Sequence, residues 1–323
     1  MKVLLVTTWE IPCGIAEHSS MLKEAVERAD PGIQIIPDAK ALDPRHVRGY
    51  TPEAFDLIHL NYQASLHSRW TPEQVAIWKE YKRPVVITYH DTGVPNSDQC
   101  KALYEVADAF IVHEPADDLP DAHYWRMGVP AWEFPYHFGK GDFAQSRECF
   151  KAWQHQPVLG SIGFPFPWKH YDKLAEVTAE HGWALMLLAP TATKEQIVQW
   201  ETINPNLYVR TDFVNRHEAI SLLAGCDATA FCYVTHNTGQ SGAVLQGIAA
   251  RKPVLAFKTC RQFRALYDEY PGSISWCETY EDVALCLKAM PLDRVSTRIV
   301  YVAERESWSR LGNKYALLYR SLL

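Results

Sequence analysis

Short apolar runs of strand length alternate with helical segments along the whole chain. These runs are continuous stretches of aliphatic and β-branched residues, without the alternation typical of a strand that has one solvated face. Strands of this kind are buried on both faces, so the chain is predicted to form parallel α/β sheets covered by helices. The predicted strands are Lys2–Thr7, Asp56–Asn61, Pro84–Tyr89, Ala109–His113, Val158–Ile162, Ala184–Ala189, Leu207–Thr211, Ala228–Cys232, Pro253–Phe257 and Ser273–Trp276.

A chain of 323 residues is long for one core and suits two domains of ordinary size. The polar and aromatic stretch 135–156 interrupts the alternation, and a new apolar strand follows it. We therefore expect Rossmann-like domains over residues 1–150 and 151–305, facing each other across a cleft, and a closing helix over 306–323 that packs back on the first domain. The predicted helices are Gly14–Arg28, Pro72–Tyr81, Tyr171–His181, Lys194–Trp200, Arg216–Ala224, Ser241–Ala250, Glu281–Met290 and a long one from about Val295 to Leu323.

The charge is uneven along the chain. Residues 1–150 hold 14 basic and 22 acidic side chains, a net charge of −8, and residues 151–323 hold 18 and 16, a net charge of +2. The acidic first half disfavours DNA and anionic membranes as partners, while the second half suits one bound polyphosphate. The cysteines are scattered and the N-terminal apolar run is short, so we expect reduced thiols, no transmembrane segment and a cytoplasmic protein. Peripheral membrane contact and the oligomeric state stay open.

A polar loop punctuated by glycine, Thr238 to Gly242, opens directly into a helix of small residues, Ala243 to Ala250. Glycine lets the backbone approach a ligand closely, and the first amides of a helix have no partner inside it. Together with the helix dipole, these amides favour an anion. A tight turn without any ligand would have the same sequence, so the loop alone leaves anion binding open.

Two strand ends of the first half carry residues suited to a ligand. Gly14 begins a helix after the first predicted strand, and His90 and Asp91 follow the third. An imidazole can donate to sugar or phosphate oxygens, and a neighbouring carboxylate can orient it. His90 could equally be a structural histidine in a loop, and His59 and His113 are expected to be core residues.

The second half opens with a similar arrangement. Gly163 ends its first strand, and Lys169 precedes the next helix. A lysine at this place can act as a point charge on a phosphate. Most single lysines are solvated surface residues, so Lys169 gains weight only in combination with the other strand ends.

In their order and spacing these pieces resemble glycosyltransferase family 4, which comprises retaining enzymes of the GT-B fold. The resemblance covers nearly the whole chain and implies a nucleotide-sugar donor on the second domain and an acceptor on the first. The matching motifs are PCGIAEHS (12–19), VVITYHDT (85–92), GSIGFPFPWKHYDKL (160–174), SGAVLQGIAARKPVLA (241–256) and the closing SWSRLGNKYALLYRSL (307–322).

The resemblance also implies a role for each position. His90 and Asp91 would be catalytic residues at the donor sugar. Gly14 would let its loop close over the diphosphate, and the helix amides would cradle it. No cofactor or metal is implied, because a lysine and a helix dipole can neutralise the leaving group. The residues assigned to the diphosphate are Gly14, Gly163, Lys169, Ser241, Gly242 and Ala243.

This chain departs from the family pattern in the same loop and helix. Many members carry two glutamates eight positions apart, where this chain has Thr238 and Gln246. Gln246 can still bind ribose hydroxyls, with Thr238 and Gln240 beside the sugar, but these residues supply no carboxylate. Phe164 stands where a basic residue is usual. The resemblance is therefore to a divergent branch, and the donor's nucleotide and sugar cannot be carried over.

The implied function is retaining, metal-independent transfer of a hexose or pentose to a hydroxyl of a saccharide, a glycan or a small molecule. A second possibility is a non-catalytic nucleotide- or sugar-binding protein that keeps the fold without the glutamates. A transferase acting on a modified nucleobase in DNA, and a GT-B epimerase or phosphorylase, are further alternatives. Hydrolysis of a nucleotide-sugar would separate an enzyme from a binding protein.

Overall fold

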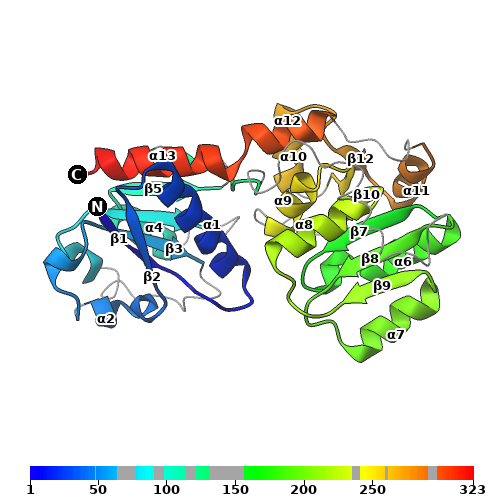
Figure 1. Cartoon of the computed structure of the whole chain (residues 1–323), viewed down its shortest axis with the longest axis horizontal. Helices are drawn as coiled ribbons and strands as arrows, with labels where there is room; N and C mark the ends of the chain where they lie inside the picture. Colours follow the sequence, from blue (N-terminus) through cyan, green and yellow to red (C-terminus); the bar gives the residue numbers. More distant parts are fainter. Residues whose placement is uncertain are drawn as a thin grey trace. The chain divides into compact units, whose positions relative to one another are not determined.

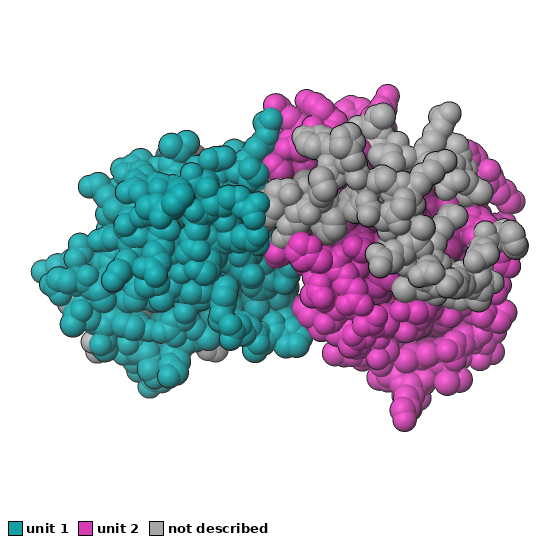
Figure 2. Space-filling view, viewed as in Figure 1, with its two compact units in different colours: residues 1–128, 308–323 teal, residues 129–307 magenta. Residues whose placement is uncertain are grey.

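A computed structural model shows two compact units. Figure 1 colours the chain along its sequence, and Figure 2 colours the two units differently. Unit 1 comprises Met1–Gly128 and Trp308–Leu323, and unit 2 comprises Val129–Ser307. Each unit contains one six-stranded sheet in which all strands are parallel. The structure describes residues 1–47, 49–63, 77–90, 98–113, 119, 121–130, 156–234, 241–258, 261–289 and 297–323.

The division between the units falls at a pair of bonded segments. The amide of Val129 donates to the carbonyl of Glu306 at 2.6 Å, and Val129 also forms an isolated bridge with Ser307. The compact units divide after residues 128 and 307, and the sequence analysis expected domain boundaries near 150 and 305. The sequence predicted one long closing helix from about Val295 to Leu323. The structure instead has two helices, α12 (Thr297–Arg305) and α13 (Trp308–Ser321).

The sheet of unit 1 has the order β2-β1-β3-β4-β5-β6. Its central strands are buried on both faces, as the continuous apolar runs predicted. The two outermost strands were not predicted, because one contains Pro37 and the other is only two residues long. The strands are β1 (Lys2–Val6), β2 (Gln34–Asp38), β3 (Leu57–Tyr62), β4 (Val85–Tyr89), β5 (Ala109–Val112) and β6 (His123–Tyr124).

Helix α13 packs against α1 (Gly14–Ala29) within unit 1, and Figure 1 shows the two side by side. Its aromatic stripe faces the sheet: Tyr319 Oη lies 2.6 Å from His59 Nδ1, and Tyr315 Oη lies 2.9 Å from Thr88 Oγ1. His59 is fully buried and belongs to this structural network. The described part of unit 1 also contains α2 (Pro44–Val47), α4 (Asp98–Val106), helical residues 77–80 and the short 3-10 turns Lys40–Leu42 and Pro52–Ala54.

Gly312 sets the close approach of α13 to α1. A Cβ atom at this position would lie 2.6 Å from the backbone carbonyl of Ala25, which cannot move without moving the helix. We expect Gly312→Ala to destabilise unit 1 by roughly 1–3 kcal/mol, as overpacking of a core does. Thermal unfolding followed by circular dichroism checks this, with the exposed Leu317→Ala on the same helix as control. Equal melting temperatures for the two variants would contradict it.

The sheet of unit 2 has the order β12-β11-β10-β7-β8-β9. Its strands are β7 (Val158–Ile162), β8 (Ala184–Leu188), β9 (Leu207–Arg210), β10 (Ala228–Phe231), β11 (Val254–Phe257) and β12 (Ser275–Cys277). Its helices besides α12 are α6 (Tyr171–Glu180), α7 (Lys194–Ile203), α8 (Arg216–Gly225), α9 (Gly242–Ala249), α10 (Arg261–Glu269) and α11 (Tyr280–Ala289). Across the described part of the chain, none of the helices combines the length and apolar character needed to cross a membrane.

Candidate functional site

Residues from three segments of unit 2 meet beyond the carboxyl ends of β7 and β10. Gly163 follows β7, Lys169 ends the 3-10 turn Pro167–Lys169, and Ala243 lies in the first turn of α9. A Cβ atom built on Gly163 would lie 2.0 Å from Lys169 Nζ and 3.6 Å from the Cβ of Ala243. The centre of the Tyr233 ring, after β10, lies 5.1 Å from the same Nζ. We call Gly163, Lys169, Tyr233 and Ala243 the lysine site.

The ammonium of Lys169 is buried away from any anionic side chain of the described residues. Lys169 is 7% exposed, and no hydrogen bond or ion pair joins its Nζ to another described residue. Burial lowers the pKa of Lys169 from 10.5 to about 7, because the protein solvates the ammonium less well than water does. The face of Tyr233 compensates in part through a cation–π contact. A bound anion would therefore stabilise the charged lysine.

The start of α9 lies next to this ammonium. Ser241 holds the N-cap position without bonding to a first-turn amide, and its Oγ lies 3.5 Å from Tyr233 Oη. The space around Gly242 is open, since a Cβ built there would meet nothing within 4 Å. The amides of Gly242 and Ala243 find no acceptor among the described residues. Exposed amides, a helix dipole and a lysine together are suited to phosphate oxygens.

Gly163 leaves the room that Lys169 occupies. Its φ of +130° is a conformation that L-residues rarely adopt, and an added methyl would overlap Nζ. We expect Gly163→Ala to displace the ammonium and to weaken binding of a nucleoside diphosphate by about tenfold, the loss of roughly one charged hydrogen bond. Gly182→Ala is the matched control, because Gly182 also has a positive φ (+68°) but open space around it. Calorimetric titration with UDP measures both, and equal affinities would contradict the expectation.

Three imidazoles gather in unit 1 beyond the ends of β4 and β5. His90 follows β4, His113 follows β5, and His18 comes from α1. Their ring centroids lie 4.6, 4.8 and 5.4 Å apart, and one nitrogen of each ring lies within 4.8 Å of those of the other two. We call His18, His90 and His113 the histidine cluster. Three imidazole nitrogens at this spacing are candidate ligands for a transition metal or partners for a hydroxyl.

Burial keeps two of these imidazoles neutral. Desolvation lowers the pKa of His18 well below 6.5, with a smaller contribution from His113, and lowers the pKa of His113 to about 4. His113 Nδ1 lies 2.7 Å from the carbonyl oxygen of Trp125, and His18 packs edge-on against Trp308 at 4.9 Å. Neutral imidazoles offer one donor and one acceptor each, so their tautomers decide what they can bind.

The structure places the predicted residues in different surroundings. Gly14 begins α1, and a Cβ built there would meet nothing within 4 Å. Gln246 lies on α9, and its Oε1 is buried with no hydrogen-bond partner among the described residues. The remaining predicted positions lie outside the described residues: Asp91, Thr238 and Gln240.

The sequence reasoning did not select four residues that the structure brings into these groups. His18 stands in the motif PCGIAEHS, four positions after Gly14, where a helix places it on the same face. The other three carry no local sequence signal, since each looks like an ordinary strand-end or core residue. They are His113, Tyr233 and Asn61, whose side chain bonds to His18 and His90 of the histidine cluster.

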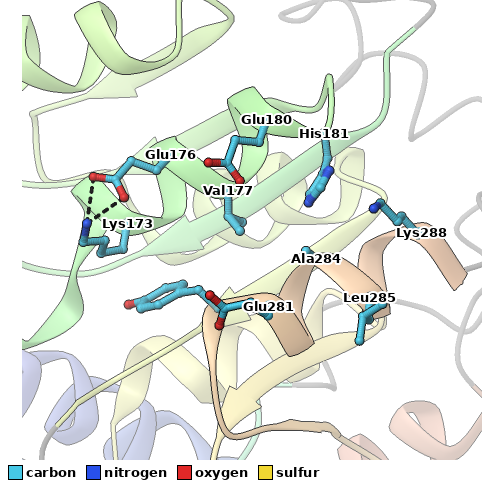
Figure 3. Close-up of a pocket in the computed structure, with 10 residues that line it drawn as sticks. Lys173, Glu176, Val177, Glu180, His181, Glu281, Ala284, Leu285 and Lys288 are labelled. Atoms are coloured by element: carbon cyan, nitrogen blue, oxygen red, sulfur yellow. Dashed lines mark hydrogen bonds and ion pairs between the residues drawn. The ribbon is translucent and has the colours of Figure 1, made fainter.

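A separate pocket of about 440 Å³ lies between α6 and α11 (Figure 3). Acidic and basic side chains mix along its walls, and Lys173 Nζ is bound to the carboxylate of Glu176 at 2.7 Å. Glu180 and Glu281 add further negative charge. This lining suits a polyanion poorly, so the pocket is a weaker candidate for a nucleotide than the lysine site.

Comparison with solved structures places both units in one known fold. Anabaena Alr3699/HepE in complex with UDP matches with a TM-score of 0.73 at 14% identity, covering 100% of each chain. Sucrose-phosphate synthase from Thermosynechococcus elongatus matches with a TM-score of 0.72 at 15% identity, covering 100% of this chain and 99% of that one. A glycosyltransferase from Rickettsia africae matches with a TM-score of 0.71 at 13% identity, covering 99% and 98%.

Neither a protein-family model nor a curated protein matches the sequence. The likeness to glycosyltransferases is therefore one of structure. The two parallel six-stranded sheets with their helices have the GT-B fold of glycosyltransferase structures, which confirms the predicted fold class.

Proposed function

We propose that this protein is a glycosyltransferase that binds a nucleotide-sugar through the lysine site and the start of α9. The observation that carries the proposal is the buried ammonium of Lys169, which has no anionic partner among the described residues. A diphosphate would supply that partner and would also accept bonds from the first amides of α9. The UDP and UDP-glucose complexes of HepE support a ligand of this class.

In the proposed reaction the bond between the sugar C1 and the diphosphate oxygen breaks while an acceptor hydroxyl forms its bond to C1 from the same face. The proton of that hydroxyl passes to the departing diphosphate oxygen. Lys169 and the helix dipole stabilise the charge on the leaving diphosphate, so no divalent cation is required. His90 and Asp91 act at the sugar. The diphosphate contacts remain those predicted: Gly14, Gly163, Lys169, Ser241, Gly242 and Ala243.

A thermal-shift panel tests the proposal, since a ligand that binds only the folded state raises the melting temperature. UDP, ADP and GDP and their glucose conjugates are the probes, each with and without EDTA. We expect a shift for at least one diphosphate that EDTA does not remove, together with slow release of free sugar from the matching conjugate. No shift with any probe would refute a nucleotide-sugar site.

The second candidate is a non-catalytic nucleotide-sugar-binding protein. The feature in its favour is that Thr238 and Gln246 stand at the two positions where the resemblance to glycosyltransferase family 4 implies glutamates in many members. Such a protein would show the thermal shift without release of sugar. The proposed acceptor of the enzyme is a hydroxyl of a saccharide, a glycan or a small molecule, and the proposed location is the cytoplasm.

A further inference from the structure

Asn61, near the end of β3, bonds to two of the three imidazoles of the histidine cluster. Its side chain is fully buried, and its amide nitrogen lies 3.1 Å from His18 Nδ1 and 2.6 Å from Ser19 Oγ. Its amide oxygen bonds to His90 Nε2. One side chain therefore joins α1 to the residue that follows β4.

The hydroxyl of Ser19 determines how this amide is oriented. Ser19 has one hydroxyl proton and donates it to the carbonyl oxygen of Ile15 at 2.8 Å, which can only accept. Its oxygen must then accept from its other partners, Thr7 Oγ1 at 2.5 Å and Asn61 at 2.6 Å. The group of Asn61 that faces Ser19 is thus the NH₂, and the amide oxygen faces His90.

The fixed amide gives the two histidines defined tautomers. An amide oxygen only accepts, so His90 carries a proton on Nε2, and in the neutral ring the lone pair lies on Nδ1. The second amide proton points to His18 Nδ1, so His18 also carries its proton on Nε2. We propose that Asn61 is a positioning residue that fixes the ring of His90 for its contact with a hydroxyl of the donor sugar. This inference rests on the proposed function, in which His90 acts at that sugar.

The same bonds argue against a metal held by all three histidines. The lone pair of His18 is engaged by Asn61, and its protonated Nε2 is buried without a hydrogen bond to any described residue. A metal at Nε2 would move the proton to Nδ1, where it would face the NH₂ of Asn61. Metal-bound histidines instead donate their second N–H to an acceptor, as His113 Nδ1 can to Trp125.

Long-range ¹H–¹⁵N spectra distinguish imidazole tautomers and need no substrate. In the wild-type protein we expect Nε2–H for His18 and His90 and Nδ1–H for His113, each signal assigned by its loss in the His→Gln variant. Asn61→Asp should keep Nε2–H at His90 but move the His18 proton to Nδ1, because a carboxylate only accepts. Nδ1–H at His90 in the wild type, or tight Zn²⁺ binding that is lost in His18→Gln, would overturn the inference.

The kinetic test uses Asn61→Leu, which removes the bonds to His18, Ser19 and His90, with UDP-glucose as donor. We expect kcat to fall by about tenfold from misorientation of His90, with an unchanged KM for the donor. Asn204→Leu is the matched control: the amide nitrogen of this buried residue in unit 2 donates to Thr178 and Trp183, and neither bond involves a histidine. It should lower the melting temperature while leaving kcat unchanged.

The outcomes separate the two claims. An unchanged kcat in folded Asn61→Leu overturns the positioning role, and if that variant does not fold, the spectra of the wild type and of Asn61→Asp decide. Expected tautomers in a protein that turns over no nucleotide-sugar refute the proposed function, and wrong tautomers in an active enzyme refute the inference alone.

Discussion

Replacing His90 by alanine is expected to lower the turnover of a nucleotide-sugar by about 100-fold while UDP affinity stays unchanged, as loss of a group that acts only at the reacting sugar does. The proposed diphosphate contacts should remain intact in this variant, because Lys169 and Ala243 lie in unit 2 and His90 lies in unit 1. A residue that served only to hold the fold would instead lower stability and affinity together.

Two further variants make the result specific to one nitrogen of the ring. The side-chain oxygen of asparagine can occupy the place of an imidazole Nδ1, whereas the end of glutamine reaches the place of Nε2. We therefore expect His90→Asn to retain more activity than His90→Gln. His123→Ala is the control, since this partly exposed ring of the same unit stacks on Trp125 and takes no part in the cluster. An unchanged kcat in His90→Ala would remove His90 from the proposed mechanism.

The fold was accessible from sequence because its signal is spread over many residues. The buried central strands are runs rich in apolar residues, and such runs alternating with helices along the whole chain leave few architectures open. The edge strand Gln34–Asp38 escaped because it is half exposed and contains proline. The break between α12 and α13 escaped because it coincides with a contact to Val129, far away in the chain, which no local pattern reveals.

The residues of the candidate site could be predicted from the sequence only where they follow the ends of strands. Gly163, Lys169 and the start of α9 follow parallel strands, so topology alone brings them to one edge. Periodicity gave no indication that Lys169 is buried, and a lysine in an aromatic loop reads as a surface residue. The amide of Asn61 could not be found either, because its partners come from α1 and β4 and only the folded chain brings them together.

Replacing Lys169 by methionine is expected to have opposite effects on the empty and the liganded protein. Methionine fills a similar volume without a charge, so the empty protein should gain roughly 1–3 kcal/mol, as when other buried unpaired charges are removed. UDP affinity should fall by roughly 10- to 100-fold, because a charge-assisted bond to the diphosphate is lost. If Lys169 served only to stabilise the fold, the substitution would not raise the stability of the empty protein while lowering its affinity for UDP.

The pH dependence of stability supplies the second half of this test. Burial lowers the pKa of Lys169 to about 7, whereas in the unfolded chain it keeps its ordinary value near 10.5. Between these values the unfolded chain holds a proton that the folded chain has released, so stability rises with pH. The contribution of Lys169 to the free energy of unfolding is complete above about pH 10.5 and is lost as the pH falls through about 7. Lys169→Met should abolish this pH dependence.

Calorimetry provides the direct measurement of both expectations. At pH 8 the empty wild-type protein holds Lys169 mainly neutral, so UDP binding should take up a proton, seen as a dependence of the binding enthalpy on the buffer. Lys169→Met should bind UDP weakly, and its binding of UDP should take up no proton at position 169. Lys173→Met, which removes a lysine already bound to Glu176 on the outer helix α6, is the control and should bind UDP like the wild type. Equal UDP affinity in Lys169→Met, or a lower melting temperature of the empty variant, would show that this ammonium is a structural charge and not the phosphate contact.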